Sequence, residues 1–425
     1  MHEDEHNEVR TTAGLFGFDT VNVVLQVELP QLERNGVLIQ VKACGLSTSW
    51  VDSVALCQVL SKISKGQCVG AGHDIAGVVV ATGEDVTTLS KGDQVVGILP
   101  LDYEQSGCSD FVMVQEFDVV LKPSTVSFVD AAGCVGDSVR AYTALHYLGR
   151  LSSGDTVIVL DGASSFGSIC IQLAHHWGAK VLTTSSSEDE KRYLQNMDVE
   201  LAQIVELNQK NASLKSVTML ETGNLGADIL VDQGIAQYPQ AGSHKADSSL
   251  AHAFSFSSSF LIPLCHFLHI MCPGTQMSCT LLGHRMVANA DILPIRGHSG
   301  GINCNIYDDN RLQNSMNLLP SKHDIISCLA VGGRWVTSKA NLQLDPPNSR
   351  LMFLRCASIG FLFEHAWMLS SAQQGRYQHI LMDIMEKVAT KTIRPNIHHT
   401  VSFDGAVEVV KALEEVRVGK VVMTI

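Results

Sequence analysis

Residues 157–167 combine a short apolar run, a turn of small residues and the expected start of a helix. Asp161 follows the apolar run, and the candidate binding turn then consists of Gly162, Ala163, Ser164, Ser165, Phe166 and Gly167. Small residues let a backbone approach a pyrophosphate, and the positive end of the following helix stabilises its charge. Gly167 holds the last glycine position of such a turn, whereas Asp161 and Ser164 stand where earlier glycines are expected. The spacing therefore fits a dinucleotide site or an ordinary turn between a strand and a helix.

The end of the next expected strand bears on which dinucleotide this turn would bind. Sites for NAD usually place an Asp or Glu there, to bind the ribose hydroxyl. Here Ser185 and Ser186 are followed by Lys191, and hydroxyls with a nearby cation suit the additional phosphate of NADP(H). The alternative is a solvated helix start, with Ser187 as N-cap and three acidic residues after it.

The surrounding elements predict an α/β fold with a doubly wound parallel sheet. From residue 130 onward, strand and helix signals alternate, as they do in such sheets. Expected helices cover residues 130–148, 168–176, 187–196 and 372–389, and expected strands cover 156–160, 180–184, 228–232 and 325–331. Residues 21–123 instead contain short runs of branched residues, punctuated by glycines, which is typical of a barrel-like β domain.

Composition excludes several classes of protein. The chain has 425 residues and a net charge of −13, and an acidic chain is a poor partner for nucleic acid phosphates. It contains no apolar run long enough to cross a membrane, so no membrane partner is expected. Its acidic start resembles neither a secretory signal nor a transit peptide. The 12 cysteines follow no regular framework, which favours reduced thiols and a cytoplasmic location.

Residues 239–304 interrupt the alternation of strands and helices. This stretch is rich in serine, histidine and cysteine and shows little periodicity, so we expect an irregular surface insertion. Cys265, His269, Cys272, Cys279 and His284 lie close together in it. Their spacing matches no standard zinc module, and we expect no metal there.

Two sets of motifs carry a resemblance to a known family. The first set is Val41–Ser47, Gly72–Val80, Gly92–Gly97, Arg140–Leu145, Thr222–Asp232 and Gly419–Val422, and it resembles the medium-chain dehydrogenase/reductase superfamily. The second set is Asp137–Leu148, Ile171–His176 and Asn341–Pro347, and it is most similar to the quinone oxidoreductase (zeta-crystallin) branch. The resemblance implies two domains, a GroES-like β barrel and a Rossmann cofactor domain. We expect the GroES-like catalytic domain over residues 1–125 and 350–425, and the Rossmann domain, with its insertion, over residues 126–349.

The resemblance also implies a function: NADPH-dependent transfer of hydride to a quinone or another activated enone. By position, Ser47 and Tyr142 would line the nicotinamide and substrate region, and Arg140 would lie beside the pyrophosphate. Gly234 and Gly332 complete the expected cofactor contacts. The resemblance further suggests a homodimer. The alternative, favoured by Asp161, Ser164 and the insertion, is a non-catalytic binding or interaction module with weak nucleotide affinity.

Relatives with alcohol dehydrogenase activity carry a catalytic zinc on a Cys, a His and an acid. In this chain His73 and Asp74 occupy the His and acid positions, but Ser47 stands at the cysteine position and is a poor zinc ligand. The cysteine-rich lobe of those relatives is also missing, with only Cys108 in that region. We therefore expect a zinc-independent protein.

Overall fold

A computed structural model describes most of the chain outside the expected insertion. The described residues are 11–17, 21–28, 32–46, 69–70, 72–101, 103, 105–207, 213–233, 320–405, 413 and 416–425, with backbone only for 11–17, 21–28, 69–70 and 404. Ser47, Gly234 and the insertion expected over 239–304, with its cluster of Cys and His residues, lie outside them.

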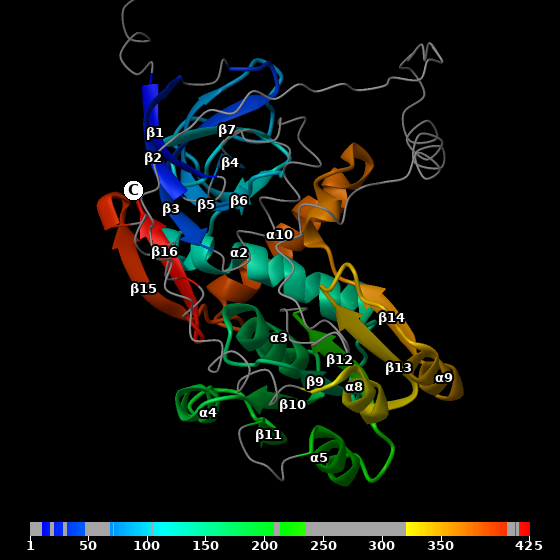
Figure 1. The fold of residues 1–425 in the computed structure, drawn as a ribbon. Helices are drawn as coiled ribbons and strands as arrows, with labels where there is room; N and C mark the ends of the chain where they lie inside the picture. Colours follow the sequence, from blue (N-terminus) through cyan, green and yellow to red (C-terminus); the bar gives the residue numbers. More distant parts are fainter. Residues whose placement is uncertain are drawn as a thin grey trace, which may run out of the picture. The chain divides into compact units, whose positions relative to one another are not determined.

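A six-stranded parallel sheet forms the centre of the cofactor domain (Figure 1). Its strand order is β11 (Gln203–Glu206), β10 (Lys180–Ser185), β9 (Thr156–Val159), β12 (Ala227–Asp232), β13 (Leu329–Thr337) and β14 (Ser358–Phe361). In chain order this is 3-2-1-4-5-6, the order of a Rossmann fold, and the direction of winding reverses between β9 and β12. The expected doubly wound sheet is confirmed.

Both faces of this sheet are covered, which explains the continuous apolar runs in its strands. Val157 and Val159 of β9 pack into one buried cluster, and Ile158 packs into another on the opposite face. The covering helices include α3 (Ser165–His176), α4 (Glu188–Gln195), α5 (Leu214–Glu221), α8 (Lys322–Cys328) and α9 (Pro346–Leu354).

The second large sheet is mainly antiparallel and draws on both ends of the chain. Its order is β15 (Ile397–Ser402), β16 (Lys420–Thr424), β3 (Gly36–Leu46), β5 (Asp74–Thr82), β6 (Gln94–Ile98) and β8 (Val119–Leu121), and β7 (Phe111–Gln115) also pairs with β3. A small sheet contains β2 (Val21–Glu28), β1 (Thr11–Gly17) and β4 (Val69–Gly70). This architecture agrees with the expected GroES-like domain.

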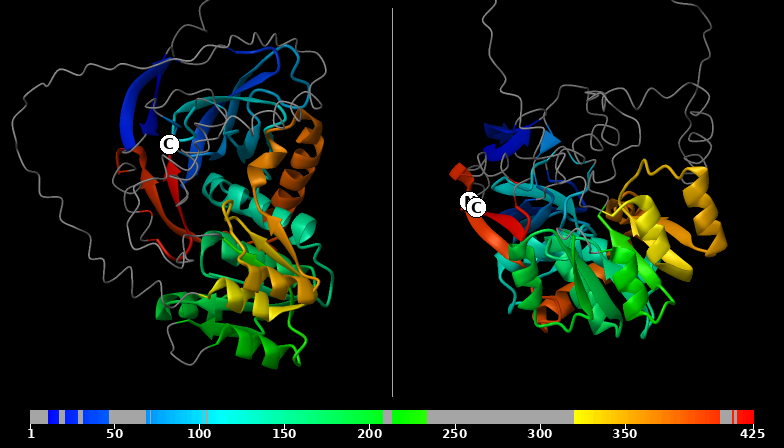
Figure 2. Two further views of the ribbon diagram at one scale, coloured as in Figure 1. Left: turned by 45° about the vertical axis from the view of Figure 1, so that its right-hand side comes forward. Right: turned by 60° about the horizontal axis from the view of Figure 1, so that its bottom comes forward.

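Helix α2 (Phe128–Tyr142) lies between the two large sheets, and α10 (Gln374–Ala389) packs beside it (Figures 1 and 2). Two glycines permit the close packing of α2 on the antiparallel sheet. A Cβ atom on Gly45 would lie 2.4 Å from the Ala132 carbonyl oxygen, and one on Gly136 would lie 2.3 Å from Asp74 Oδ1. A π-helical segment, η1 (Thr143–Leu148), continues α2 to the end expected from the sequence.

Two features differ from the sequence-based expectations. The strand expected over residues 325–331 is wrong at its start, because Ile325–Cys328 form the second half of helix α8 and the strand runs from Leu329 to Thr337. A capping box at Ser321 and Asp324 starts that helix. The parallel sheet also extends beyond residue 349, the expected end of the cofactor domain, because β14 pairs with β13. No helix in the described part of the chain is long and apolar enough to span a membrane.

Candidate functional site

The turn between β9 and α3 lies where the winding of the parallel sheet reverses, which is where ligands bind in open α/β sheets. Its shape depends on two glycines. A Cβ atom on Gly162 would meet Thr183 Oγ1 at 2.0 Å, and one on Gly167 would meet the Asp161 carbonyl oxygen at 2.2 Å. Ser164 caps helix α3, with its hydroxyl accepting a hydrogen bond from the Gly167 N–H at 3.0 Å. The turn therefore has the close packing and helix start of a dinucleotide site.

Asp161 takes the left-handed backbone conformation, with φ of 56°, that a glycine would adopt without strain. Its backbone N–H donates to Thr184 Oγ1 at 2.9 Å, which ties the turn to β10. Its carboxyl group accepts a hydrogen bond from the Gln233 side chain at 3.1 Å. Burial, with a further contribution from the nearby Glu190, raises the pKa of Asp161 to about 7. The carboxyl group is therefore substantially protonated near neutral pH.

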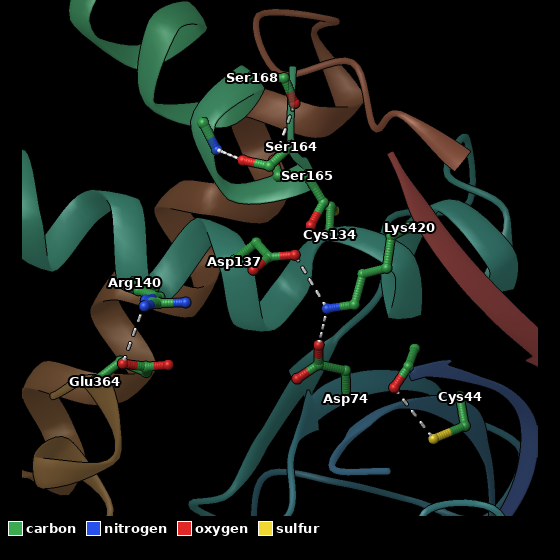
Figure 3. A network of polar contacts seen from close by, with 12 residues as sticks. Cys44, Asp74, Cys134, Asp137, Arg140, Ser164, Ser165, Ser168, Glu364 and Lys420 are labelled. Carbon is green, nitrogen blue, oxygen red and sulfur yellow. Dashed lines mark hydrogen bonds and ion pairs between the residues drawn. The ribbon is translucent and has the colours of Figure 1, made fainter. Parts of the chain in front are cut away.

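Arg140 of α2 joins four parts of the site, and Figure 3 shows its contact with Glu364. Its guanidinium donates to the Gln233 carbonyl oxygen at 3.2 Å and to the Ser338 hydroxyl at 2.5 Å, beyond the ends of β12 and β13. It lies over the Phe166 ring, 4.6 Å from the centroid, and pairs with Glu364 at 3.9 Å. The structure thus brings Arg140 close to the turn, through its contacts with Phe166 and Gln233.

The residues expected to bind a ribose phosphate lie at the end of β10 and the start of α4. Ser185 is buried, and its hydroxyl has no hydrogen-bond partner within the described residues. The Ser186 N–H donates to the Glu190 carboxylate at 2.5 Å. Lys191 pairs with Glu206, at the end of β11, at 2.9 Å, and this hydrogen bond raises the pKa of Lys191. The cation is therefore present in the expected region but is held by an acidic neighbour.

Tyr142 and Gly332 lie away from this turn. Tyr142 packs in an aromatic cluster, with ring centroids 5.4 Å from Trp177 and 5.2 Å from His146. Trp177 caps the C-terminal end of α3, opposite to the end that Ser164 caps. Gly332 lies in the first half of β13, whereas the turn follows the carboxyl end of β9. The structure does not bring these two residues together with the other site residues.

A buried ion triad connects the antiparallel sheet to α2 (Figure 3). Lys420 Nζ lies 2.5 Å from Asp74 Oδ2 and 3.1 Å from Asp137 Oδ2. Burial alone would lower the pKa of Lys420, but the two carboxylates more than offset it and raise that pKa. Asp74, the acid at the zinc position of the alcohol dehydrogenases, is thus bound to an ammonium group in this chain.

His73 lies immediately before β5 and contacts His365 of the short helix η2 (Glu364–Trp367), with ring centroids 6.3 Å apart. Within the described part of the chain, no group of three or more His, Cys, Asp or Glu side chains is arranged to hold a metal ion. The cysteines of that part that are free thiols are Cys44, Cys108, Cys134, Cys170, Cys328 and Cys356.

Sequence reasoning did not find Gln233, Ser338 and Glu364. Gln233 and Ser338 directly follow β12 and β13, and polar residues at the carboxyl ends of parallel strands meet at one edge of the sheet. That position was a usable signal. Glu364 contacts Arg140 because of the course that the chain takes after β14, and no local sequence pattern predicts that course.

Comparison with known proteins identifies the family. Residues 33–146 match the alcohol dehydrogenase GroES-like domain. Quinone oxidoreductase-like protein 1 of Mus musculus is 36% identical over 367 residues, which span 86% of this chain and 84% of the mouse protein. The chain belongs to the medium-chain dehydrogenase/reductase superfamily, in its quinone oxidoreductase-like branch.

More distant relatives match smaller parts of this quinone oxidoreductase-like chain. The NADPH-dependent alkenal/one oxidoreductase of Arabidopsis thaliana is 29% identical over 194 residues, which span 44% of this chain and 49% of that protein. Among solved structures, the CurK enoyl reductase has a TM-score of 0.65 at 17% identity, covering 97% of this chain and 99% of that chain. The quinone oxidoreductase from Coxiella burnetii has a TM-score of 0.63 at 18% identity, with the same coverage of each. Both structures share the fold.

Proposed function

We propose that the chain is a zinc-independent reductase that uses NADPH to transfer hydride to quinones or other activated enones. The observation that carries this proposal is the β9–α3 turn, in which Gly162 and Gly167 leave no room for a Cβ atom at the reversal point of the sheet. Such close packing has a purpose where a backbone must approach a pyrophosphate.

The residues of the turn fit a dinucleotide. The first N–H groups of α3 have no acceptor within the helix, so they and the positive end of the helix favour an anion. The raised pKa of Asp161 reduces its negative charge near neutral pH, which lowers the repulsion of a pyrophosphate. Arg140 adds a positive charge close to the turn, with its guanidinium over the Phe166 ring.

When bound, the nicotinamide ring supplies the hydride, and the protein contributes binding, orientation and exclusion of water. Lys191 and the hydroxyl of Ser185 are the groups we assign to the additional phosphate of NADPH. Arg140 orients the ends of β12 and β13 through Gln233 and Ser338. Ser47 and Tyr142 remain residues proposed to line the substrate region, with Ser47 outside the described residues and Tyr142 in the aromatic cluster.

Two observations support an enone-type acceptor and zinc independence. The plant relative is named for NADPH-dependent reduction of alkenals and alkenones. The carboxylate of Asp74 is bound to Lys420 and Lys420 also binds Asp137, so this acid is engaged with an ammonium group rather than placed as a metal ligand. A zinc ion at this position would have to compete with that ion pair.

A non-catalytic binding module is the second candidate. The hydrogen bonds from Gln233 to Asp161 and Ser164 favour it, because they place a side chain across the turn. Fluorescence titration with NADPH separates the two candidates. We expect saturable binding, and an absence of binding at millimolar NADPH would favour the non-catalytic module.

Turnover is the direct test of the proposed function. A panel of quinones and conjugated enones is assayed with NADPH and with NADH, while the absorbance of the reduced cofactor is followed. We expect oxidation of NADPH with at least one acceptor, and full activity after treatment with a chelator. Activity lost on chelation and restored by zinc would contradict zinc independence.

We also propose that the protein is a cytoplasmic homodimer that uses the edge of the parallel sheet. Among the described strands, β14 is the last of that sheet, and Phe361 at its end is 54% exposed. An unpaired strand edge with an exposed aromatic side chain is suited to pairing with a second copy. The free thiols support a reducing compartment.

A further inference from the structure

His73 is a half-buried histidine without an assigned role. It precedes β5 in the antiparallel sheet, and its carbonyl oxygen accepts a hydrogen bond from the Leu99 N–H at 2.8 Å. This bond fixes the backbone of His73. Both ring nitrogens are buried, and neither has a hydrogen-bond partner among the described residues.

His365 contacts the His73 ring from the side of the parallel sheet. It lies in η2, which follows the carboxyl end of β14 in the parallel sheet. The two rings are inclined at 72°, and Nδ1 of His365 is also buried without a partner in the described part of the chain. Three unpartnered ring nitrogens thus gather where loops of the two sheets meet.

Both imidazoles are neutral under ordinary conditions. Burial, and to a lesser extent His365, lowers the pKa of His73 to about 3, and a smaller contribution from the Leu99 backbone acts in the opposite direction. Burial, with a further contribution from the positive charge of Arg140, lowers the pKa of His365 to about 4. A neutral imidazole carries one N–H donor and one acceptor nitrogen. Since buried polar groups in folded proteins are almost always paired, these nitrogens need a partner that has oxygen atoms or water.

The surroundings narrow the choice of that partner. Glu364, next to His365, pairs with Arg140, and Asp74, next to His73, pairs with Lys420. Both neighbouring carboxylates are therefore engaged elsewhere. No metal-holding group of three side chains includes either histidine among the described residues. Through Arg140, this position also connects to Gln233 and Ser338 at the carboxyl edge of the parallel sheet, where ligands of such sheets bind.

We propose that His73 and His365 form a donor pair that binds the carbonyl oxygen of the acceptor. The proposal rests on the proposed reductase function and adds two residues to its substrate site. When the acceptor takes up hydride, negative charge develops on its carbonyl oxygen, and N–H donors stabilise that charge. The oxygen then takes a proton from solvent, so one quinone, one NADPH and one proton give one hydroquinone and one NADP⁺. The histidines donate hydrogen bonds and are not consumed.

The kinetics of variants with phenylalanine in place of each histidine test the proposal, because phenylalanine keeps an aromatic ring but has no N–H donor. Duroquinone is a suitable acceptor, because every alkene carbon of its ring is methylated and does not readily add the free thiols of the chain. We expect His73→Phe and His365→Phe each to lower kcat and kcat/KM for duroquinone by about tenfold or more, since a donor to the developing charge is lost. The dissociation constant for NADPH is expected to stay unchanged. Gln at either position retains an N–H donor and is expected to recover part of the loss.

The matched control is His379→Gln, which changes an exposed histidine of α10 and is expected to have wild-type kinetics. If both Phe variants fold and keep kcat/KM within about twofold of wild type, the proposed role of the two histidines as donors is refuted, and the proposed reductase function is unaffected. If the wild-type protein binds NADPH but reduces no acceptor, the reductase function and the donor pair fall together.

A measurement on the wild-type protein covers the case in which the Phe variants do not fold. In a sample with ¹⁵N-labelled histidine, saturated with NADP⁺, the ring signals of His73 and His365 are assigned from the two Gln variants. Addition of duroquinone is expected to shift both sets of signals and to leave those of His379 in place. Unchanged signals for His73 and His365 at saturating duroquinone would overturn the proposal.

Discussion

Asp161 is expected to make the proposed nucleotide binding sensitive to pH. Its pKa is raised from 3.8 to about 7, so the folded protein binds this proton more strongly than the unfolded chain does. The stability that this proton provides is present at low pH and is lost as the pH rises through about 7. Over the same range the carboxyl group gains a negative charge beside the proposed pyrophosphate site.

We therefore predict that nucleotide affinity falls between pH 6 and 8 and that Asp161→Asn removes this dependence. Asn tolerates the left-handed backbone of residue 161 and cannot ionise. The dissociation constant of the wild-type protein for NADH should rise by about threefold or more over this range, as the like charge appears. NADH is the appropriate probe because it lacks the ribose phosphate, which itself titrates near pH 6. A wild-type affinity that is independent of pH would contradict this role of Asp161.

Lys191 and Glu206 set the expected preference between the two dinucleotides. The ion pair between them, at 2.9 Å, competes with any phosphate for the Lys191 ammonium. We predict that Glu206→Gln tightens NADPH binding by about two- to fivefold, the range expected when a partly exposed ion pair is released. NADH binding should be unaffected.

Lys191→Met is the partner variant and should weaken NADPH binding alone. Fluorescence titration of the wild type, Glu206→Gln and Lys191→Met with NADPH and with NADH measures the dissociation constants. Equal effects on NADPH and NADH would place Lys191 away from the ribose phosphate.

The Lys420 triad links three elements through buried charges. It joins β5 and β16 of the antiparallel sheet to α2, and all three side chains are largely buried. Removal of the ammonium group leaves two buried carboxylates without compensation. We predict that Lys420→Ala lowers the free energy of unfolding by about 3–5 kcal/mol, the usual cost of breaking a buried ion pair. Urea denaturation at pH 7 measures it.

The control for this prediction is Arg34→Ala, which breaks an exposed ion pair with Asp85 at 2.9 Å. Its expected cost is below about 1 kcal/mol. If the two variants lose equal stability, the triad does not hold α2 to the sheet.

Most elements of the cofactor domain could be predicted because their signals are local. The alternation of apolar strands and capped helices determined β9, α3, β10, α4 and β12 to within a few residues. The strand predicted at Ile325–Cys328 was wrong, because a short apolar run has no clear period and does not distinguish a strand from a helix. The capping box of Ser321 and Asp324 was the signal that indicated a helix. The parallel sheet passed the expected domain boundary because strand pairing is a long-range property.

The site was less predictable than the fold because its residues meet through tertiary packing. Arg140 and Tyr142 are two positions apart on α2, and side chains at that spacing face different sides of a helix. Only one of them could reach the turn. The contact of His73 with His365 joins a residue that precedes β5 to one in η2, which are far apart in the sequence, so it has no local signature.

At the scale of the whole molecule, the parallel sheet ends in a strand that is open to pairing. Within the described part of the chain, β14 pairs only with β13, and its residues are partly or fully exposed. Natural proteins usually protect such an edge with charge, proline or a covering element. Here the strand ends in Phe361, which is 54% exposed. Pairing of β14 with its copy would join two sheets about a twofold axis and cover the edge in both subunits.

We predict that the wild-type protein sediments as a dimer and that Phe361→Lys shifts it toward the monomer, because a lysine on each copy would bring like charges together across the axis. Sedimentation velocity at several protein concentrations measures the change. Leu220→Lys, which alters a leucine of α5 that is 80% exposed, is the matched control and should leave the dimer intact. A dimer that persists in Phe361→Lys would assign the interface to another surface, and a monomeric wild-type protein would refute the dimer itself.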